Sequence, residues 1–454
     1  MMKTPLILIN PWIHDFAAYD LWSKPLGLLY VASYLRDSGF QVHLIDCLDV
    51  HHPGMKKYPR PSGPVRRAFG TGKFWRKQIP KPPPLKDVPR NYYRYGISKS
   101  LFHEALNRVP NPAAILVTSL MTYWYPGVRE TITIAREVHP NTPVILGGIY
   151  ASLCRDHAEG HTGADLVFPG SGFDSLGSLT ETLAQLGIRG QKSPPSVGRV
   201  SYPAFDLLGK IDYVCVLTSR GCPYKCAYCA SPLLSPRFLQ RDPDQVVSEI
   251  EYWRREYGIR DFAFYDDALL IGWEDHLGVI LEGLLRLNLD LRFHTPNALH
   301  LREMSFALAR LLYRSGFKTI RLGLETTDSR LHRELDRKVS EGDFERAIAS
   351  LHRAGFEKKQ IGAYILLGLP GQGVESVSRT VKAVGRLGAM PYLAEYSPIP
   401  KTPLWENALE SSEYDLAGEP LFHNNTLVPC WQEGQRRMVP ELRRMVREMR
   451  ADLP

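Results

Sequence analysis

The chain has 454 residues, of which 44% are hydrophobic and 23% charged. These values are close to the averages of soluble globular proteins, so a small disulfide scaffold, a fibrous repeat and a wholly disordered chain are excluded. The longest apolar runs, such as residues 6–9, fall far short of the ~18 residues that a membrane span needs. The apolar stretch behind Lys3 also reaches Pro11 too soon for a signal-peptide core. We therefore expect a cytoplasmic protein with no membrane span.

The net charge of +8 is concentrated in one segment. Residues 56–94 hold twelve Lys and Arg and a single acid, so they contribute +11 and the rest of the chain is net −3. The surrounding segment, residues 52–96, is rich in proline and has no apolar periodicity, so we expect it to form no packed core. We favour an extended surface loop. Nucleic-acid binding is the alternative, because the segment also offers aromatic rings for stacking: Phe74, Trp75, Tyr92, Tyr93 and Tyr95.

The first region, residues 1–181, alternates strand and helix patterns. Strands are expected at residues 6–9, 41–46, 114–119, 144–146 and 166–168, and helices at 26–38 and 127–138. This order predicts an α/β fold with a doubly wound parallel sheet. Ligands of such sheets bind beyond the carboxyl ends of the strands.

A proline-containing linker, residues 182–206, is expected to lead into a second α/β region, residues 207–405. Strands are expected there at 213–218, 261–265, 291–295, 319–323, 362–367 and 393–396, and helices at 243–257, 275–287, 303–315, 343–354 and 373–387. Six repeats are too few for a closed eight-stranded barrel, so we predict a partial (β/α)6 barrel with its site at the carboxyl ends of the strands. The tail, residues 406–454, is helical and is expected to end in one basic helix over 432–450.

Three of the seven cysteines, Cys222, Cys226 and Cys229, crowd into the loop after the first strand of the second region. An odd total and this crowding indicate metal ligands, not disulfides. Thiolates are the ligands of iron–sulfur clusters, and a four-iron cluster held only by protein needs four of them. Because no fourth ligand lies nearby, one iron would stay open. Zinc is the alternative, disfavoured because a partner Cys or His at finger spacing is missing.

The CxxxCxxC spacing at this place in a partial barrel, with Tyr228 before the last cysteine, resembles the radical S-adenosylmethionine (SAM) enzymes. The resemblance covers roughly residues 210–405. It implies a 4Fe-4S cluster on the three cysteines whose open iron chelates S-adenosylmethionine. It further implies reductive cleavage of S-adenosylmethionine to a 5′-deoxyadenosyl radical, and an electron donor such as flavodoxin or ferredoxin.

Three further strand ends match this family. Asp266 and Asp267 follow the second strand, where many members have Gly-Gly-Glu to hold the methionine amino group. The paired Asp departs from that motif and resembles the branch with an amino-terminal cobalamin-binding domain. Glu325 is a candidate polar contact to the cofactor, and Gly368 can let backbone approach adenine or ribose. The alternatives are a solvated turn or helix cap for either Asp, a surface salt bridge for Glu325 and an ordinary turn at Gly368.

In the first region, Ser119, Thr122, Gly147 and Gly148 lie in loops that resemble those of the cobalamin-binding domain. The Asp-x-His-x-x-Gly signature of a cobalt ligand is missing, and His14 in the first loop is disfavoured as a substitute. The resemblance therefore implies cobalamin held without a protein ligand to cobalt. A tight turn in a domain that has lost its cofactor is the alternative for the two glycines.

These features predict a radical SAM enzyme that acts on a small molecule or metabolite. If cobalamin binds, methyl transfer to an unactivated carbon or phosphorus follows; without it, a radical rearrangement, oxidation or ring contraction is open. An RNA methylthiotransferase is disfavoured, because that group carries three more cysteines in its first domain and only Cys47 and Cys154 are present here. A non-catalytic iron–sulfur redox sensor is a further alternative. The sequence identifies neither the substrate nor the residues that react with it.

Overall fold

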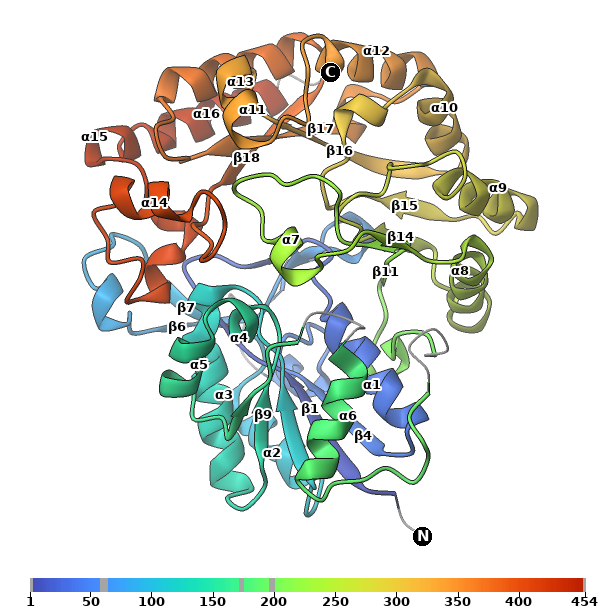
Figure 1. The fold of residues 1–454 in the computed structure, drawn as a ribbon, viewed down its shortest axis with the longest axis vertical. Coiled ribbons are helices and arrows are strands. Elements are labelled where there is room, and N and C mark those ends of the chain that lie inside the picture. Colours follow the sequence, from blue (N-terminus) through green and yellow to red (C-terminus); the bar gives the residue numbers. More distant parts are fainter. Residues whose placement is uncertain (1–2, 58–63, 171–174, 196–200, 452–454) are drawn as a thin grey trace. The chain divides into compact units, whose positions relative to one another are not determined.

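The computed structural model describes residues 3–57, 64–170, 175–195 and 201–451. The chain divides into two compact units, Met1–Asp212 and Tyr213–Pro454 (Figure 1). Each unit is built on a parallel β-sheet. The two sheets are described separately below as unit 1 and unit 2.

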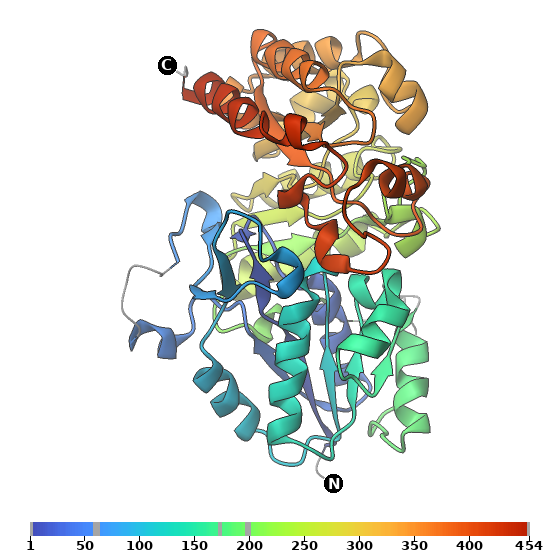
Figure 2. The ribbon, with the colours of Figure 1, turned by 90° about the vertical axis from the view of Figure 1, so that its left-hand side faces the viewer.

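The main sheet of unit 1 has five parallel strands in the order β10-β9-β8-β1-β4. Their bounds are Leu166–Val167, Val144–Leu146, Ala114–Val117, Pro5–Asn10 and Gln41–Asp46. The strand order reverses between β1 and β8, which is the switch point at which doubly wound sheets bind ligands. Helices lie on both sides of this sheet (Figure 2). The predicted α/β fold of unit 1 is therefore confirmed.

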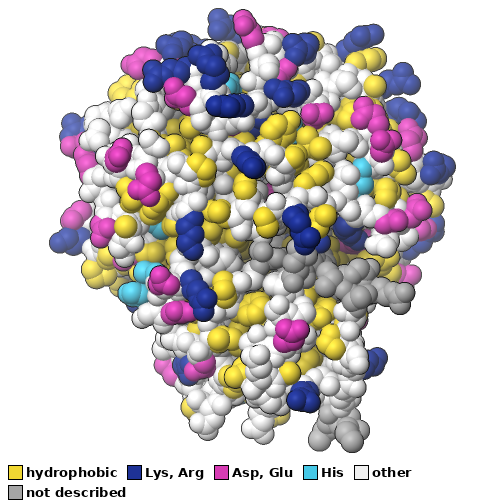
Figure 3. Space-filling model, in the orientation of Figure 1, with side chains coloured by type: hydrophobic (Ala, Val, Ile, Leu, Met, Phe, Trp, Pro, Cys, Tyr) yellow, Lys and Arg dark blue, Asp and Glu magenta, His cyan; other side chains and the backbone are white. Residues whose placement is uncertain are grey.

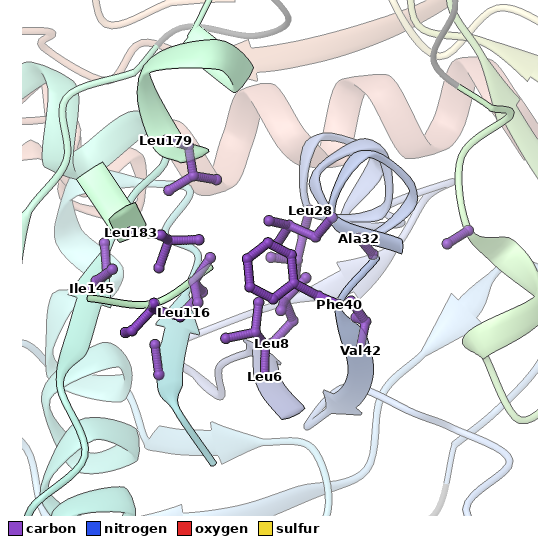
Figure 4. Close-up of a cluster of buried hydrophobic side chains, with 14 residues drawn as sticks. Leu6, Leu8, Leu28, Ala32, Phe40, Val42, Leu116, Ile145, Leu179 and Leu183 are labelled. Atoms are coloured by element: carbon purple, nitrogen blue, oxygen red, sulfur yellow. The ribbon is translucent and has the colours of Figure 1, made fainter. Parts of the chain in front are cut away.

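Alternation along the strands divides the core of unit 1 into two layers. Leu6 and Leu8 point to the face covered by α1 (Leu26–Asp37) and α6 (Leu176–Gln185), where Leu28 and Leu183 complete a dry cluster (Figure 4). Ile7 and Ile9 are just as buried on the opposite face, which α2 (Lys99–Asn107) and α3 (Tyr125–Val138) share. Burying each such side chain is worth about 1.5–3 kcal/mol.

The basic segment is folded, so our expectation that it has no packed core was wrong. Strands β2 (Ile13–Asp15), β7 (Tyr92–Tyr95) and β6 (Arg76–Ile79) form an antiparallel sheet, and β3 (Tyr19–Asp20) pairs with β5 (Gly72–Lys73). Phe74 and Tyr95 pack with Ile13, Leu48 and Val50 in a small core of their own. Most of the apolar partners come from outside the segment, which is why no periodicity within it marked a core. Residues 58–63 lie outside the described part.

The expected linker packs against unit 1. Helix α6 continues to Gln185, and both Ile188 and Ala204 join the buried cluster beneath α1. The Ser33 hydroxyl donates to the carbonyl of Tyr202 at 2.7 Å. The described parts of residues 182–206 therefore wrap around unit 1, and residues 196–200 lie outside the described part.

Unit 2 contains six parallel strands in the order β11-β14-β15-β16-β17-β18, which confirms the predicted sheet. Their bounds are Val214–Val216, Asp261–Phe264, Arg292–His294, Phe317–Glu325, Ile361–Leu367 and Met390–Glu395. The helices between them are α8 (Pro243–Tyr257), α9 (Leu277–Leu287), α10 (Phe306–Arg314), α12 (Asp343–Ala354) and α13 (Val374–Arg386). Strand order equals chain order, as expected for consecutive βα repeats of an open barrel.

The tail packs onto unit 2 and contains α14 (Trp405–Ser411), α15 (Glu433–Arg436) and α16 (Val439–Ala451). The single basic helix expected over 432–450 is thus two helices. Pro440 explains the break, because a proline has no N–H for the carbonyl four residues earlier and fits only the first turn of a helix. Across the described residues, the helices are all too short or too polar to cross a membrane.

Candidate active site

The cysteine loop leaves and re-enters unit 2 through a short antiparallel ladder. Strand β12 (Ser219–Arg220) pairs with β13 (Leu239–Gln240), so the loop between them closes at the carboxyl end of β11. Gly221 opens the loop with φ +73°, and a Cβ there would lie 2.4 Å from the carbonyl oxygen of Arg237. Only glycine permits both this backbone conformation and this approach. The first residue of the Gly-Cys pair therefore fixes where the thiols begin.

Two backbone hydrogen bonds hold the middle of the loop against the rest of unit 2. The Ala227 N–H donates to the carbonyl of Leu335 at 2.7 Å, and the Leu404 N–H donates to the carbonyl of Ala227 at 3.0 Å. Ala227 and Tyr228 also pack against the buried cluster that contains Leu404. Both backbone groups of the residue that follows the central cysteine are thus bonded, so Cys226 is presented from a fixed backbone.

The three cysteines of the loop form no disulfide and differ in how deeply they are buried. Cys226 is buried, whereas Cys222 and Cys229 are partly exposed. Burial raises the pKa of Cys226 to about 12 and also raises the pKa of Cys222. Both thiols are therefore protonated at neutral pH in the absence of a metal, and binding iron would displace those protons.

The donor set suits an iron–sulfur cluster with one open corner. Within the described ranges, no three Cys, His, Asp or Glu side chains converge closely enough to enclose a single metal ion. The thiolates of a cubane need no such convergence, because each one binds a different iron. Cys215, the nearest other cysteine in the sequence, is fully buried within β11. Cys222, Cys226 and Cys229 are thus the residues that would hold the cluster.

A buried ion pair lies behind the thiols. The Lys338 ammonium is 2.7 Å from Glu325 Oε1, and both side chains are less than a tenth exposed. Burial by itself would lower the pKa of Lys338. The carboxylate of Glu325 and the sulfur of Cys226 nevertheless raise this pKa. Lys338 also lies 5.6 Å from the centre of the Tyr228 ring. A fixed positive charge therefore stands beside the cysteines, where it can stabilise thiolates and a negatively charged cluster.

The backbone at Glu325 adopts a conformation that non-glycine residues seldom take. Its φ is +65°, and the pairing of β16 with β17 shifts register between Gly323 and Glu325. This bulge turns the Glu325 side chain toward Lys338 at the carboxyl end of β16. Left-handed backbone at such a residue costs about 1–3 kcal/mol, and such residues cluster at functional sites.

Sequence reasoning missed Lys338 and the groups that hold it. Lys338 follows the short helix α11 (Ser329–Leu335), and its backbone N–H donates to Asp336 Oδ1 at 3.1 Å. Asp336 also accepts from the Tyr228 hydroxyl at 3.3 Å and pairs with His332. In the sequence, Asp336 to Lys338 looks like any charged surface loop, so no local signal marked it.

His300 is a second residue that the sequence did not single out. Its Nε2 lies 4.0 Å from Cys222 Sγ, and its ring lies 4.7 Å from that of Tyr224. Burial, together with the charge of Lys338, lowers the pKa of His300 to about 4. The imidazole is therefore neutral at physiological pH and adds no charge to the thiol environment.

The two aspartates after β14 have different surroundings. Asp266 is buried and accepts from the Thr218 hydroxyl at 2.8 Å and the Ser219 hydroxyl at 2.7 Å, as well as from both backbone N–H groups. It thereby fixes the strand end that leads into the cysteine loop. Asp267 is exposed and lies near Ser231 and Cys222. Only Asp267 of the pair retains a carboxylate that can face a bound cofactor.

Gly368, after β17, approaches another part of the chain. Its φ is +95°, and a Cβ there would lie 2.6 Å from a methyl carbon of Val428 in the tail. The side-chain oxygen of Gln372 accepts from the Gly368 N–H at 2.9 Å. The glycine is thus required by the tail and by the turn that Gln372 closes.

In unit 1, the predicted cobalamin residues meet at the carboxyl edge of the sheet. The Ser119 hydroxyl donates to the carbonyl of Gly147 at 2.7 Å, and a Cβ on Gly148 would lie 2.2 Å from the carbonyl oxygen of Ser119. Thr122 is buried at the start of the next turn, beside the exposed Met121. The edge therefore offers backbone, small polar groups and one exposed thioether. His14 is committed elsewhere, because its Nε2 lies 3.0 Å from Glu130 Oε2.

Known proteins resemble both units. Residues 216–384 match the radical SAM superfamily. An uncharacterized methyltransferase of Pyrococcus horikoshii is 23% identical over 62% of this chain and 66% of its own length. The cytidylyl-2-hydroxyethylphosphonate methyltransferase of Streptomyces wedmorensis is 21% identical over 80% of this chain and 73% of its own length.

Among solved structures, the radical S-adenosylmethionine methyltransferase TsrM of Kitasatospora setae, with tryptophan and a S-adenosylmethionine analogue bound, matches with a TM-score of 0.64 at 18% identity. The match covers 100% of this chain and 90% of that one. TsrM has also been solved with cobalamin and a 4Fe-4S cluster. At this identity the likeness establishes the fold.

The fold of unit 2, its three-cysteine loop and the superfamily match together define a radical SAM domain. Residues 216–384 are therefore a radical SAM domain, and the proteins similar to this chain include ones named methyltransferases.

Proposed function

We propose that this chain is a cobalamin-dependent radical SAM methyltransferase that transfers a methyl group to an unactivated carbon or phosphorus of a small molecule. The observation that carries the proposal is the three-thiol loop with a lysine–glutamate pair behind it, in a chain whose two units share the fold of a cobalamin-bound methyltransferase. We place the reaction in the cytoplasm, because a reducing compartment keeps the three thiols of the cysteine loop available to iron.

Each residue of the site has a distinct task in this proposal. The three cysteines hold the cluster, which when bound supplies the electron that cleaves S-adenosylmethionine. The exposed Asp267 accepts from the methionine ammonium, a role that the buried Asp266 leaves to it. Lys338 compensates negative charge next to Cys226 and keeps Glu325 in place. Ser119 and the Gly147–Gly148 turn form the edge on which the corrinoid rests without a protein ligand to cobalt.

The cluster is tested by removing one thiol at a time. Cys222→Ser, Cys226→Ser and Cys229→Ser should each lose most of the bound iron and nearly all release of 5′-deoxyadenosine from S-adenosylmethionine in anaerobically reconstituted protein. Cys154→Ser is the matched control, because Cys154 lies in unit 1 and should change neither reading. Undiminished iron and 5′-deoxyadenosine in the three variants would refute the cluster. Iron without 5′-deoxyadenosine in the parent chain would indicate a redox sensor.

Cobalamin binding is tested separately, with hydroxocobalamin. We expect the purified chain to retain the corrinoid, as seen in its absorption spectrum. Gly148→Ala should abolish retention, because the new Cβ would collide with Ser119 and the backbone φ is +97°. Gly160→Ala is the control, since nothing lies within 4 Å of a Cβ at that helical position. If the parent chain retains no corrinoid while 5′-deoxyadenosine is still formed, methyl transfer is excluded and a radical rearrangement, oxidation or ring contraction replaces it.

RNA is less well supported as a substrate. The aromatic rings that would stack on bases include Phe74, Tyr92 and Tyr95, and all three are buried. An open stacking platform needs exposed ring faces. Of the five rings of the basic segment, only Trp75 and Tyr93 are partly exposed and left for stacking.

The electron donor is proposed to be an acidic flavodoxin-type or ferredoxin-type protein that docks on unit 2. A groove of about 740 Å³ there is lined by Lys358, Arg379, Lys382 and Arg386, with Glu345 as the acidic lining residue. In the described part of the chain, none of these four cations has an ion-pair partner within 4 Å. Thr327, two residues beyond Glu325, also lines the groove. Lys and Arg side chains gather over α13 and α16 in Figure 3.

Reversing the charge of the groove distinguishes an effect on donor docking from an effect on the cleavage of S-adenosylmethionine. Lys382→Glu/Arg386→Glu should slow flavodoxin-driven formation of 5′-deoxyadenosine by about tenfold or more at low salt, because like charges now face the donor. The rate with dithionite should stay unchanged, since a small reductant needs no docking surface. Arg310→Glu, an exposed residue of α10 outside the groove, is the control. Equal loss with both reductants would refute the docking surface.

A further inference from the structure

Unit 1 contains a cationic pocket that the proposed function does not use. It has a volume of about 340 Å³, which falls in the range of small-molecule sites. Three cations and five aromatic residues dominate its lining: Lys73, Arg76, Arg90, Phe16, Tyr19, Phe74, Tyr93 and Tyr95. No acidic side chain is among the described residues that line it. The basic segment therefore contributes to a concave site.

Strand pairing positions Arg76. Strand β6 pairs with β7 so that Arg76 lies opposite Tyr95, and Tyr93 is two residues along on the same face of β7. The Arg76 guanidinium lies 4.5 Å from the centre of the Tyr93 ring, and Arg76 partly offsets the effect of burial, which raises the pKa of Tyr95 to about 12. Two contacts from one strand thus hold the guanidinium in a defined orientation.

The other two cations are placed by the neighbouring elements. Lys73 pairs with Tyr19 across the β3–β5 ladder. Arg90, in the turn that precedes β7, lies 5.8 Å from the centre of the Phe16 ring. Phe16 is itself fixed, because its carbonyl accepts from the Tyr95 hydroxyl at 3.3 Å. The three charges therefore come from three separate chain segments that meet at one recess.

The acids nearest to the pocket are bound to other groups. Asp20 pairs with Arg66 at 2.8 Å, and Asp15 accepts from the indole N–H of Trp124 at 2.7 Å. Among the described residues, no Asp or Glu lies within 4 Å of the charged atoms of Lys73, Arg76 or Arg90. The positive charge of the pocket is thus uncompensated by the protein. An ordinary solvated surface would spread such charges, whereas here they line one cavity.

We propose that this pocket binds the phosphoryl group of a small molecule. Two oriented guanidinium groups and an ammonium supply the charge-assisted hydrogen bonds that a phosphoryl dianion accepts. Stacking on Tyr93 and Phe16 restricts both guanidinium groups before the ligand arrives, which lowers the entropy lost on binding. Tyr19, about half exposed, leaves an apolar surface for the group that carries the phosphate. A nucleic acid is disfavoured, because the pocket is closed on one side by buried rings.

The test uses the full chain and three probes. Phenyl phosphate and inorganic phosphate should bind in isothermal titration calorimetry, and phenol, which lacks the phosphoryl group, should not. Arg76→Gln/Arg90→Gln should weaken phenyl phosphate binding by about tenfold or more, since two charge-assisted contacts are lost. Lys77→Gln is the matched control: it removes one positive charge from the same strand at a residue outside the pocket lining.

Several results would overturn the proposal. Absence of phosphate binding to the parent chain would do so, as would equal affinity for phenol and phenyl phosphate. An equal loss with Lys77→Gln would indicate general charge attraction. Tighter binding of a single-stranded oligonucleotide, weakened alike by Lys77→Gln, would make the segment a nucleic-acid surface. Thermal melts of the variants, which change only exposed side chains, should match that of the parent chain and exclude unfolding as the cause.

Discussion

The carboxyl edges of the two parallel sheets differ in how their polar side chains are bonded. In unit 1 the strand ends satisfy one another, since Ser119 donates to Gly147 and the Asn10 amide donates to Asp46 at 2.7 Å. In unit 2 the strand ends carry the three-cysteine loop and a buried Lys338–Glu325 pair. The edge in unit 1 is therefore a surface of hydrogen-bonded polar groups, whereas the edge in unit 2 carries ionisable and metal-binding side chains. A doubly wound sheet and an open barrel place loops alike, so the difference lies in the residues of those loops.

Backbone strain follows the same division. Both edges contain positive-φ glycines, Gly148 in unit 1 and Gly221 and Gly368 in unit 2, but unit 2 also has this backbone at Glu325. Glycine takes this conformation without penalty, while a glutamate does so only where the surroundings compel it. The pair with Lys338 is the compensating contact. The difference indicates that unit 2 has given up local stability to place a carboxylate.

The largest effect is expected from splitting that pair. Lys338→Met should reduce the free energy of unfolding by about 3–5 kcal/mol, because it leaves the Glu325 carboxylate buried without a partner. Lys338→Met/Glu325→Gln should recover most of that loss, since no buried charge remains. Urea denaturation followed by circular dichroism measures both.

Lys318→Met supplies the control for this comparison. Lys318 is an exposed residue of the same strand, β16, so its replacement should stay within about 0.5 kcal/mol of the parent chain. A double variant no more stable than Lys338→Met would mean that the ion pair is not the source of the loss. The strain argument would then lose its compensating contact.

The next effect distinguishes the two aspartates after β14. Asp266→Asn should cost about 2–3 kcal/mol, because an amide N–H₂ would then face donors from Thr218 and Ser219. Asp267→Asn should leave stability unchanged and reduce formation of 5′-deoxyadenosine, since Asp267 is the exposed member. Denaturation curves and product assays on both variants measure the contrast. Equal effects of the two variants in both assays would show that the pair acts as one site.

The regular elements could be read from the sequence because each pattern was local. The helix over 243–257 was predicted with its observed bounds, since Asp242 caps its start and Gly258 ends it with φ +69°. The strand over 41–46 was predicted just as closely. The sheet in the basic segment was missed because Phe74 and Tyr95 are buried by Ile13, Leu48 and Val50, which lie outside that segment. Such a core has no signature within any one stretch of chain.

The residues of the candidate active site were likewise predictable only where they form a local motif in the sequence. Three cysteines in one loop are a local motif, so the ligands were found. Lys338 lies more than a hundred residues after the loop, in a run of charged residues that resembles any solvated turn. Asp266 and Asp267 are adjacent, yet only the fold shows that one is a positioning group. Sequence spacing thus predicts ligands that share a loop, whereas groups that act across strands need the packed structure.

The smallest expected effect is the pH dependence of folding stability that Glu130 causes in unit 1. Burial on its own would raise the pKa of Glu130. His14, Lys99 and Arg94 nevertheless hold this pKa at about 2. A carboxyl whose pKa is lower in the folded state stabilises the fold above its unfolded pKa. That contribution is lost as the pH falls from about 4.5 toward 2. Because nearly a quarter of the side chain is exposed and solvent screens it, we expect on the order of 1–2 kcal/mol.

Glu130→Gln isolates this contribution. The variant should be less stable than the parent chain at pH 7, and the difference should shrink as the pH falls through the interval from about 4.5 toward 2. Glu104→Gln is the control, because that carboxylate is exposed and pairs only with Arg108 at 4.0 Å. Urea midpoints measured across this pH range give the comparison. A difference independent of pH would assign the role of Glu130 to packing, and the polar groups of unit 1 would then be structural without an electrostatic share.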